Sequence, residues 1–195
     1  MKNILVIGAG LSSSSMIKYL LENAENEGWF VRVGDMNEAL AIQKVGNHSR
    51  GKAFKFNALN AEERWAELQN VDLVISMLPA HLHLEVVKDC IKLKINTITP
   101  SYVSDGMKEL DAAAKEAGII LMNEIGVDPG MDHMSAKKIL DDIEAKGGKM
   151  DCFESFTGGL VAPESDDNPW NYKFTWNPRN VVLAGQGGAA KFIQE

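Results

Sequence analysis

Short apolar runs alternate with helical patterns along the first 123 residues of the chain. The runs predict strands, the first at Lys2–Ile7, the second ending at Asp35, and the others at Lys52–Phe56, Val71–Met77, Ile95–Thr99 and Ile119–Asn123. Apolar residues at helical spacing predict helices between them, after Ser12, across Ala39–Val45, from Asn60, and across His81–Leu93 and Ser104–Gly118. Strands that alternate with helices in this way predict an α/β fold built on a doubly wound parallel sheet.

The pattern changes after Asn123. A Gly/Pro loop over residues 124–130 is followed by a predicted helix that ends near Lys146, and then by strand-like segments at Met150–Phe156 and Val181–Ala184. One helix and two or three strands cannot bury a core of their own. We therefore expect a first domain over residues 1–124 and the beginning of a second α/β domain over residues 125–195. On this basis the chain is expected to be the amino-terminal portion of a longer protein.

A glycine turn joins the first strand to its helix. Gly8 permits a tight turn out of the strand, and Gly10 leaves room for a pyrophosphate to approach the backbone. Ser13 stands where this motif normally has a third glycine, and serine is small enough to fit. Asp35, at the end of the second strand, is placed to accept hydrogen bonds from an adenosine ribose. The order strand, Gly-x-Gly, helix, strand and acid is typical of a Rossmann NAD(P)-binding domain. The alternative, a turn that binds no nucleotide, leaves Asp35 without a role.

In an open parallel sheet the ligand lies beyond the carboxyl ends of the strands. The candidates to hold an adenosine diphosphate are therefore Gly8, Gly10, Leu11, Ser12, Ser13, Asp35, Met36, Asn57 and Ala58. Those expected beside the nicotinamide half are Met77, Leu78 and Thr99. Tyr102 and Asp128 are then the polar groups nearest the reactive ring. Two plainer interpretations stay open: Tyr102 as a half-buried tyrosine with a hydrated hydroxyl, and Asp128 as the brace of a turn.

Other polar residues indicate no metal site. His81 and His83 lie two apart on a predicted helix, so they point to different faces and cannot share a metal ion. His133 beside Asp132 is interpreted as a neighbour of a helix cap. The aromatic residues of the last segment are expected to pack in a core or an interface, and they are Trp170, Tyr172, Phe174 and Trp176.

The composition narrows the class of protein. The net charge of −7 disfavours a nucleic-acid or anionic-membrane partner. No run approaches the ~20 apolar residues that span a bilayer, and the first strand begins too early to leave room for a signal peptide. Cys90 and Cys152 are the only cysteines, and two free thiols in a cytoplasmic protein are the expectation.

Several longer motifs resemble the saccharopine dehydrogenase (L-glutamate-forming; saccharopine reductase) family. They are the segments Ser101–Ser104, Met107–Gly118, Met122–His133, Gly158–Ser165, Asp167–Pro169 and Tyr172–Trp176. The resemblance implies an oxidoreductase of lysine metabolism. Such an enzyme oxidises the secondary amine of saccharopine with NAD(P), and hydrolysis of the imine gives L-glutamate and 2-aminoadipate 6-semialdehyde.

The resemblance also implies roles for particular residues. Ser101, Tyr102 and Asp128 would contact the substrate, with Tyr102 or Asp128 as the acid/base. The cofactor would lie against Gly10–Ser13, Asp35, Leu78, Thr99, Gly126 with its neighbour Val127, and Trp176. The family often has cysteine where this chain has Thr157. Because the basic groups that hold the substrate carboxylates are expected beyond residue 195, the chain alone is expected to be inactive.

Asp35 favours NAD over NADP, because a carboxylate binds a ribose 2′-hydroxyl and repels a 2′-phosphate. NADP is kept as the alternative cofactor. Arg32 lies within the second strand and is expected to point elsewhere.

The partner is expected to be a small-molecule amino-acid substrate, and a homodimer is considered. Alternative functions are a carboxynorspermidine dehydrogenase or homospermidine synthase-like enzyme, or a non-catalytic NAD-binding regulatory protein.

Overall fold

The computed structural model describes residues 1–156, 158–159, 161–174, 179 and 182. Contacts divide the chain into two units, Met1–Met150 and Asp151–Glu195, and each is considered by itself. The expected domain boundary between residues 124 and 125 stays a prediction. In the part of the chain that the structure describes, no helix is both long and apolar enough to cross a membrane.

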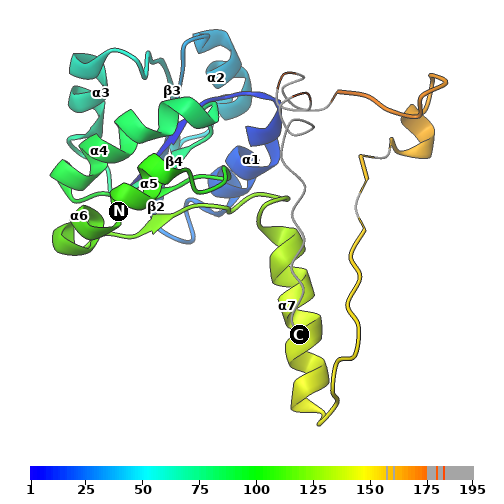
Figure 1. The fold of residues 1–195 in the computed structure, drawn as a ribbon. Helices are drawn as coiled ribbons and strands as arrows, with labels where there is room; N and C mark the ends of the chain where they lie inside the picture. The colour runs from blue at the N-terminus through cyan, green and yellow to red at the C-terminus, as the bar shows by residue number, and fades with distance from the viewer. Residues whose placement is uncertain (157, 160, 175–178, 180–181, 183–195) are drawn as a thin grey trace. The chain divides into compact units, whose positions relative to one another are not determined.

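The first unit is built on one parallel sheet (Figure 1). Its strands are β1 (Lys2–Ile7), β2 (Trp29–Asp35), β3 (Gly51–Lys55), β4 (Leu73–Ser76), β5 (Asn96–Ile98) and β6 (Leu121–Met122). Their order across the sheet is β3-β2-β1-β4-β5-β6, and each neighbouring pair is parallel. The strand order reverses between β1 and β4, which confirms the predicted doubly wound sheet and places the ligand-binding crevice at the carboxyl ends of these two strands.

Helices follow the strands as predicted. They are α1 (Ser14–Asn23, preceded by the 3-10 turn η1 at Leu11–Ser13), α2 (Glu38–Val45), α3 (Ala61–Leu68), α4 (His83–Leu93, preceded by η2 at Ala80–Leu82), α5 (Asp105–Glu109), α6 (Asp111–Ala117) and α7 (Met131–Ala145); a further turn, η3, lies at Pro163–Ser165. The single helix predicted over Ser104–Gly118 is wrong in one respect. The N–H of Leu110 donates to Met107 O, which tightens the chain into a turn and separates α5 from α6. Both ends are correct, since Ser104 Oγ caps α5 and Gly118 ends α6 in the left-handed conformation.

Asn60 caps α3, because its Oδ1 accepts from the N–H groups of Glu62 and Glu63. Glu63 does not complete a capping box with Asn60. Glu63 Oε1 accepts from the N–H of Asn57 at 3.0 Å, and the N–H of Asn60 donates to Asn57 O. Both contacts hold the loop after β3 against the first turn of α3. This loop is one of those that lie at the carboxyl edge of the sheet.

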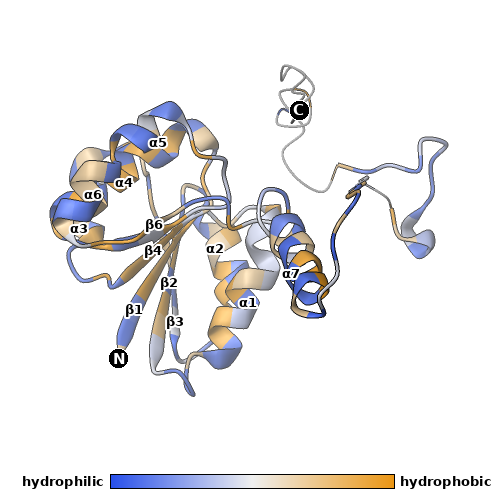
Figure 2. Cartoon of the chain, turned by 60° about the horizontal axis from the view of Figure 1, so that its bottom comes forward, coloured by the Kyte–Doolittle hydropathy of each residue, from blue (hydrophilic) through white to orange (hydrophobic). Residues whose placement is uncertain are grey.

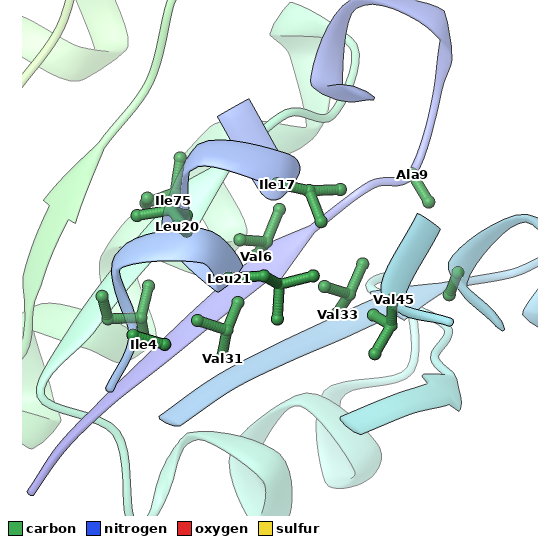
Figure 3. Close-up of a cluster of buried hydrophobic side chains, with 12 residues drawn as sticks. Ile4, Val6, Ala9, Ile17, Leu20, Leu21, Val31, Val33, Val45 and Ile75 are labelled. Carbon is green, nitrogen blue, oxygen red and sulfur yellow. The ribbon is translucent and has the colours of Figure 1, made fainter. Parts of the chain in front are cut away.

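Two hydrophobic layers cover the sheet, one on each face. Along β1, Ile4 and Val6 point into the layer beneath α1 and α2, whereas Leu5 and Ile7 point into the layer beneath α3 and α4. Figure 3 shows the first layer, and in Figure 2 the apolar sides of the helices face the strands. Because both faces are buried, β1 is apolar at every position from Ile4 to Ile7. This packing fixes the carboxyl ends of the strands as a rigid rim for the loops that follow.

The segments after β6 agree only in part with the predictions. The helix expected to end near Lys146 is confirmed as α7. Met150–Phe156 does not form the predicted strand, because no partner strand pairs with it in the described part of the chain. The predicted strand Val181–Ala184 lies outside the described residues apart from Val182. Trp170 and Phe174 are exposed rather than packed in a core. Cys90 is buried, Cys152 is exposed, and both are free thiols as expected.

Candidate functional site

The glycine turn after β1 has the geometry that its sequence predicts. Gly8 has a φ of 106°, and a side chain there would place its Cβ 3.0 Å from the carbonyl oxygen of Met77, the residue after β4. Only glycine meets both conditions without strain. A Cβ at Gly10 would meet open space. Ser13 fits in place of the third glycine, since it is fully buried and its Oγ donates to Gly10 O at 2.9 Å, which closes the turn.

Free backbone donors lie at the start of the helix. The N–H groups of Gly10, Leu11 and Ser12 have no acceptor among the described residues. They precede α1, whose amino-terminal end carries the positive end of the helix dipole. Unpaired N–H groups beside open space at a helix start are the donor set that binds a phosphate or pyrophosphate. The residues present therefore fit a dinucleotide diphosphate.

Asp35 lies at the end of β2, where it was expected, but its carboxylate already has protein partners. Oδ2 accepts from the N–H of Ala9 at 2.7 Å, and Oδ1 accepts from the N–H of Asn37 at 2.8 Å. The side chain thus ties the end of β2 to the glycine turn. Arg32 points to the other face, as predicted, where it pairs with Glu67 and lies over the ring of Phe54 at 5.0 Å.

The remaining residues predicted to bind the cofactor mainly support the loops at the carboxyl ends of the strands. Met36 is exposed, and Ala58 is buried with its carbonyl oxygen accepting from Arg64 Nη1 at 2.6 Å. Asn57 Oδ1 accepts from the N–H of Leu59. Met77 and Leu78 pack against the two hydrophobic layers. Trp176 and Thr157 lie outside the described residues. The cofactor contact expected of Trp176 therefore stays a prediction.

A hollow lies beside the glycine turn, between α1 and α2. It is lined by Ala9, Gly10, Leu11, Ser14, Lys18, Leu21, Glu22, Leu40, Gln43, Lys44 and His48. Lys44 of α2 reaches across it and donates to Ser14 Oγ. The hollow therefore has a cation close to the backbone donors of the turn.

A buried histidine joins the ends of β4 and β5. His83 Nδ1 lies 2.8 Å from Ser76 Oγ, and Nε2 lies 2.8 Å from Ser101 Oγ and 3.0 Å from Thr99 Oγ1. Burial lowers the pKa of His83 to about 4, with a smaller contribution from His81. The sequence reasoning missed this residue because it weighed His83 only as a metal ligand. A histidine at the first turn after a strand is a signal for a contact with the strand ends.

The residues predicted to act on the substrate come together at the end of β5. The hydroxyl of Tyr102 donates to Asp128 Oδ1 at 2.9 Å, and Glu124 Oε1 accepts from the N–H of Val103 at 3.0 Å. The hydrogen bond to Asp128 raises the pKa of Tyr102 above its usual value, and burial adds to the rise. The N–H of Glu124 also donates to Ser101 O, so the segment after β6 is held beside the segment after β5.

The loop that carries Asp128 is closed by glycines. Gly126 and Gly130 form a bridge, and a Cβ at Gly126 would lie 3.2 Å from Pro100 Cβ. Val127 is exposed, while Asn123 Oδ1 is buried without a hydrogen-bond partner in the described part of the chain. Among the described residues, no group of three or more His, Cys, Asp or Glu side chains gathers to hold a metal ion.

The fold and the glycine turn define a dinucleotide-binding domain of the Rossmann class. A family model described as the saccharopine dehydrogenase NADP binding domain matches residues 4–122, and one described as the saccharopine dehydrogenase C-terminal domain matches residues 126–195. The chain belongs to the saccharopine dehydrogenase family.

Individual relatives agree with this assignment. A saccharopine dehydrogenase [NADP(+), L-glutamate-forming] from Pyricularia oryzae is 40% identical over 97% of this chain and 41% of its own length. A mitochondrial alpha-aminoadipic semialdehyde synthase from Bos taurus is 39% identical over 93% of this chain and 19% of its own length. The apo structure of saccharopine dehydrogenase (L-Glu forming) from Saccharomyces cerevisiae matches with a TM-score of 0.82 and 38% identity, over 94% of this chain and 40% of that one. The chain thus spans about two fifths of the length of the saccharopine dehydrogenases it matches.

Proposed function

We propose that the protein to which this chain belongs oxidises the secondary amine of saccharopine with a nicotinamide dinucleotide. The products would be L-glutamate and 2-aminoadipate 6-semialdehyde, and the reaction belongs to lysine metabolism. The observation that carries the proposal is the Tyr102–Asp128 pair beside the end of β5, in a chain 40% identical to a saccharopine dehydrogenase over 97% of its length.

The chain's own residues have three tasks in this reaction. The N–H groups of Gly10, Leu11 and Ser12 bind the diphosphate, and the rigid ends of β4 and β5 orient the nicotinamide half. A nicotinamide held there would supply the acceptor for the hydride that leaves the carbon next to the amine nitrogen. That amine must lose its proton before the transfer, and a water molecule must lose a proton to add to the imine.

Asp128 is the proposed base for these proton steps, and Tyr102 is the proposed donor. The phenol of Tyr102 donates to Asp128 Oδ1 at 2.9 Å, and this hydrogen bond raises the pKa of Tyr102 further above neutral pH. A carboxylate at this position can accept a proton from the amine, and the hydrogen bond from the phenol holds the carboxylate in place.

The test of these roles uses the full-length protein. Asp128→Asn should lower kcat by roughly 10²–10⁴-fold, and Tyr102→Phe should lower it less. Tyr19→Phe, an exposed tyrosine on α1, is the matched control and should leave kcat unchanged. Asp128→Asn should also lower the pKa of Tyr102 toward its usual value, which spectrophotometric titration of the tyrosinate measures. An Asp128→Asn protein with full activity would refute the assignment of the base.

NADP is the nucleotide that we propose. The matching family model is described as an NADP binding domain, and the Pyricularia oryzae relative has NADP(+) in its name, so the NAD preference expected from Asp35 has less support. The carboxylate of Asp35 accepts hydrogen bonds from two backbone N–H groups, which reduces its repulsion of a 2′-phosphate. Lys44 is the proposed cation for that phosphate.

Binding and turnover of the full-length protein with NADP and NAD test this choice. Lys44→Gln should weaken NADPH binding by about 10-fold, as expected for one charge-assisted hydrogen bond, and leave NADH binding nearly unchanged. Lys88→Gln, an exposed lysine on α4 that pairs with Glu85, is the control. Equal losses for both nucleotides, or a wild-type preference for NADH, would contradict the proposal.

Saccharopine turnover separates the remaining interpretations. A related dehydrogenase would oxidise a polyamine adduct instead, and a regulatory protein would bind the nucleotide without consuming any substrate.

Size-exclusion chromatography of the full-length protein tests whether it is a homodimer. Cell fractionation tests the expected cytoplasmic location, since the name of the Bos taurus relative is mitochondrial.

A further inference from the structure

His83 is a buried imidazole that none of the proposed chemical steps uses. It is the first residue of α4, and its ring reaches back to the ends of two neighbouring strands. Ser76 is the last residue of β4, while Thr99 and Ser101 follow β5. One side chain therefore connects both strands at the rim where the nicotinamide half and the substrate are proposed to lie.

The hydrogen-bond partners of Ser76 decide which ring nitrogen carries the proton. Ser76 is fully buried, and His83 Nδ1 is the partner of its Oγ among the described residues. If Nδ1 carried the proton, the buried hydroxyl hydrogen of Ser76 would have no acceptor, which is unfavourable for a buried polar group. With the proton on Nε2, the Ser76 hydroxyl donates to Nδ1 and every polar hydrogen of the pair is satisfied.

The same tautomer sets the direction of the next hydrogen bonds. The Nε2–H group then donates to Ser101 Oγ at 2.8 Å and to Thr99 Oγ1 at 3.0 Å. Thr99 Oγ1 also accepts from the N–H of Ser101 at 3.3 Å. Both hydroxyl oxygens accept from the protein, so neither hydroxyl hydrogen is used by the ring, and the Ser101 hydrogen can donate to a ligand. Ser101 is the more exposed of the two, since Thr99 is only 2% exposed.

We propose that His83 is a positioning residue which, with Ser76, presents the Ser101 hydroxyl as a hydrogen-bond donor to a carboxylate of the amino-acid substrate. The inference rests on the proposed function for the identity of that substrate. A donor suits a carboxylate oxygen, whereas the other tautomer would use the Ser101 hydrogen inside the protein and leave only lone pairs facing the ligand.

The surroundings of His83 keep it uncharged. The groups that hydrogen-bond to the ring are the hydroxyls of Ser76, Thr99 and Ser101, and none of them is charged. The titratable neighbour His81 adds to the lowering of the pKa of His83. Burial lowers the pKa of His83 to about 4, so the ring stays neutral over the physiological range and the tautomer persists. Ser101 is followed directly by Tyr102, so the same contacts also hold the segment that carries the proposed donor.

Variants of the full-length protein test the role of His83. His83→Asn keeps a polar group near the position of Nδ1 but removes the contact with Ser101, whereas His83→Gln keeps a donor near the position of Nε2. His83→Asn should raise the KM for saccharopine by about 10-fold or more, with the affinity for NADPH changed by less than about twofold. His83→Gln should restore most of the lost KM. His81→Gln, which alters an exposed neighbour, is the matched control.

Two further measurements separate positioning from a general loss of structure. Ser101→Ala should raise KM as His83→Asn does, and the double variant should be no worse than either single one, because both act through one hydrogen bond. Additive losses, or equal defects in His83→Asn and His83→Gln, would overturn the inference.

Nitrogen NMR of the histidine-labelled full-length protein reads the tautomer directly, and His83→Gln assigns the signal. A proton on Nε2 is expected, and a proton on Nδ1 would refute the inference even if the wild-type protein oxidises saccharopine. A protein that shows the Nε2 tautomer but leaves saccharopine unchanged would instead refute the proposed function and with it the identity of the substrate carboxylate.

Discussion

Acid should destabilise the folded chain through His83 in particular. Burial lowers the pKa of this imidazole from 6.5 to about 4, whereas the unfolded chain keeps the higher value. Between these two values the unfolded state binds a proton that the folded state does not, so stability falls as the pH falls. At about 1.4 kcal/mol per pKa unit, the full loss is about 3 kcal/mol, and most of it has occurred by about pH 4.5. Above about pH 6.5 the group makes no contribution to the pH dependence.

Urea unfolding followed by tryptophan fluorescence measures this loss. The free energy of unfolding is determined between about pH 7 and about pH 4.5 for the wild type and for His83→Gln, which cannot titrate. Carboxylates such as Asp72 and Glu85, whose pKa values are lowered by lysine partners, contribute equally to both proteins and cancel in the difference. The wild type should lose about 2–3 kcal/mol more than His83→Gln. His81→Gln removes only the smaller contribution to the lowered pKa of His83, so its loss should stay close to that of the wild type. Identical pH slopes for His83→Gln and the wild type would refute the reasoning.

Two more changes test the parts of the fold that support the site. Gly8→Ala places a side chain at a φ of 106° and against Met77, so it should cost about 2–3 kcal/mol of stability and weaken dinucleotide binding, whereas Gly28→Ala, at a φ of 68° with open space around it, should cost about 1 kcal/mol. Arg64→Met removes the partner of the buried Asp89 carboxylate at 2.6 Å, and the more distant Lys92, at 3.5 Å, is the ion-pair partner that remains among the described residues. The change should cost about 3 kcal/mol. Urea unfolding measures the stability of each variant. A Gly8→Ala protein as stable as Gly28→Ala would contradict the packing described for the glycine turn. An Arg64→Met protein as stable as the wild type would contradict the packing described around Asp89.

The sheet was predictable because each strand has a signal that depends only on its own residues. Ile4–Ile7 is apolar at every position, which requires a layer on each face, and the helices that follow supply both layers. The glycine turn was equally predictable, since the positive φ of Gly8 is a property that few other residues tolerate. The break at Leu110 was not, because α5 and α6 each have good helical spacing and only the contact of Leu110 with Met107 separates them.

A site residue could be predicted from the sequence only where its position directly after a strand was sufficient evidence. Tyr102 and Asp128 were chosen because each follows a strand, and the structure brings them within a hydrogen bond of each other. The His83 network depends on β4 and β5 being neighbours and on which way the first turn of α4 faces. These are tertiary facts, and the spacing of His81 and His83 carries no information about them.

Asp35 shows how a sound local rule depends on what surrounds the residue. The rule that an acid after β2 selects NAD assumes a carboxylate that is free to bind ribose hydroxyls, yet here both oxygens hold backbone N–H groups of Ala9 and Asn37. If Asp35 mainly braces the glycine turn, Asp35→Asn in the full-length protein should weaken NADP and NAD together, because an amide can accept only one of the two hydrogen bonds and its NH₂ group faces the other donor. If Asp35 instead selects the nucleotide, the same change should improve NADP relative to NAD. Titration of both nucleotides against Asp35→Asn decides between these roles, and a ratio of the two affinities that moves toward NADP by about 10-fold or more would show that the brace is not its main function.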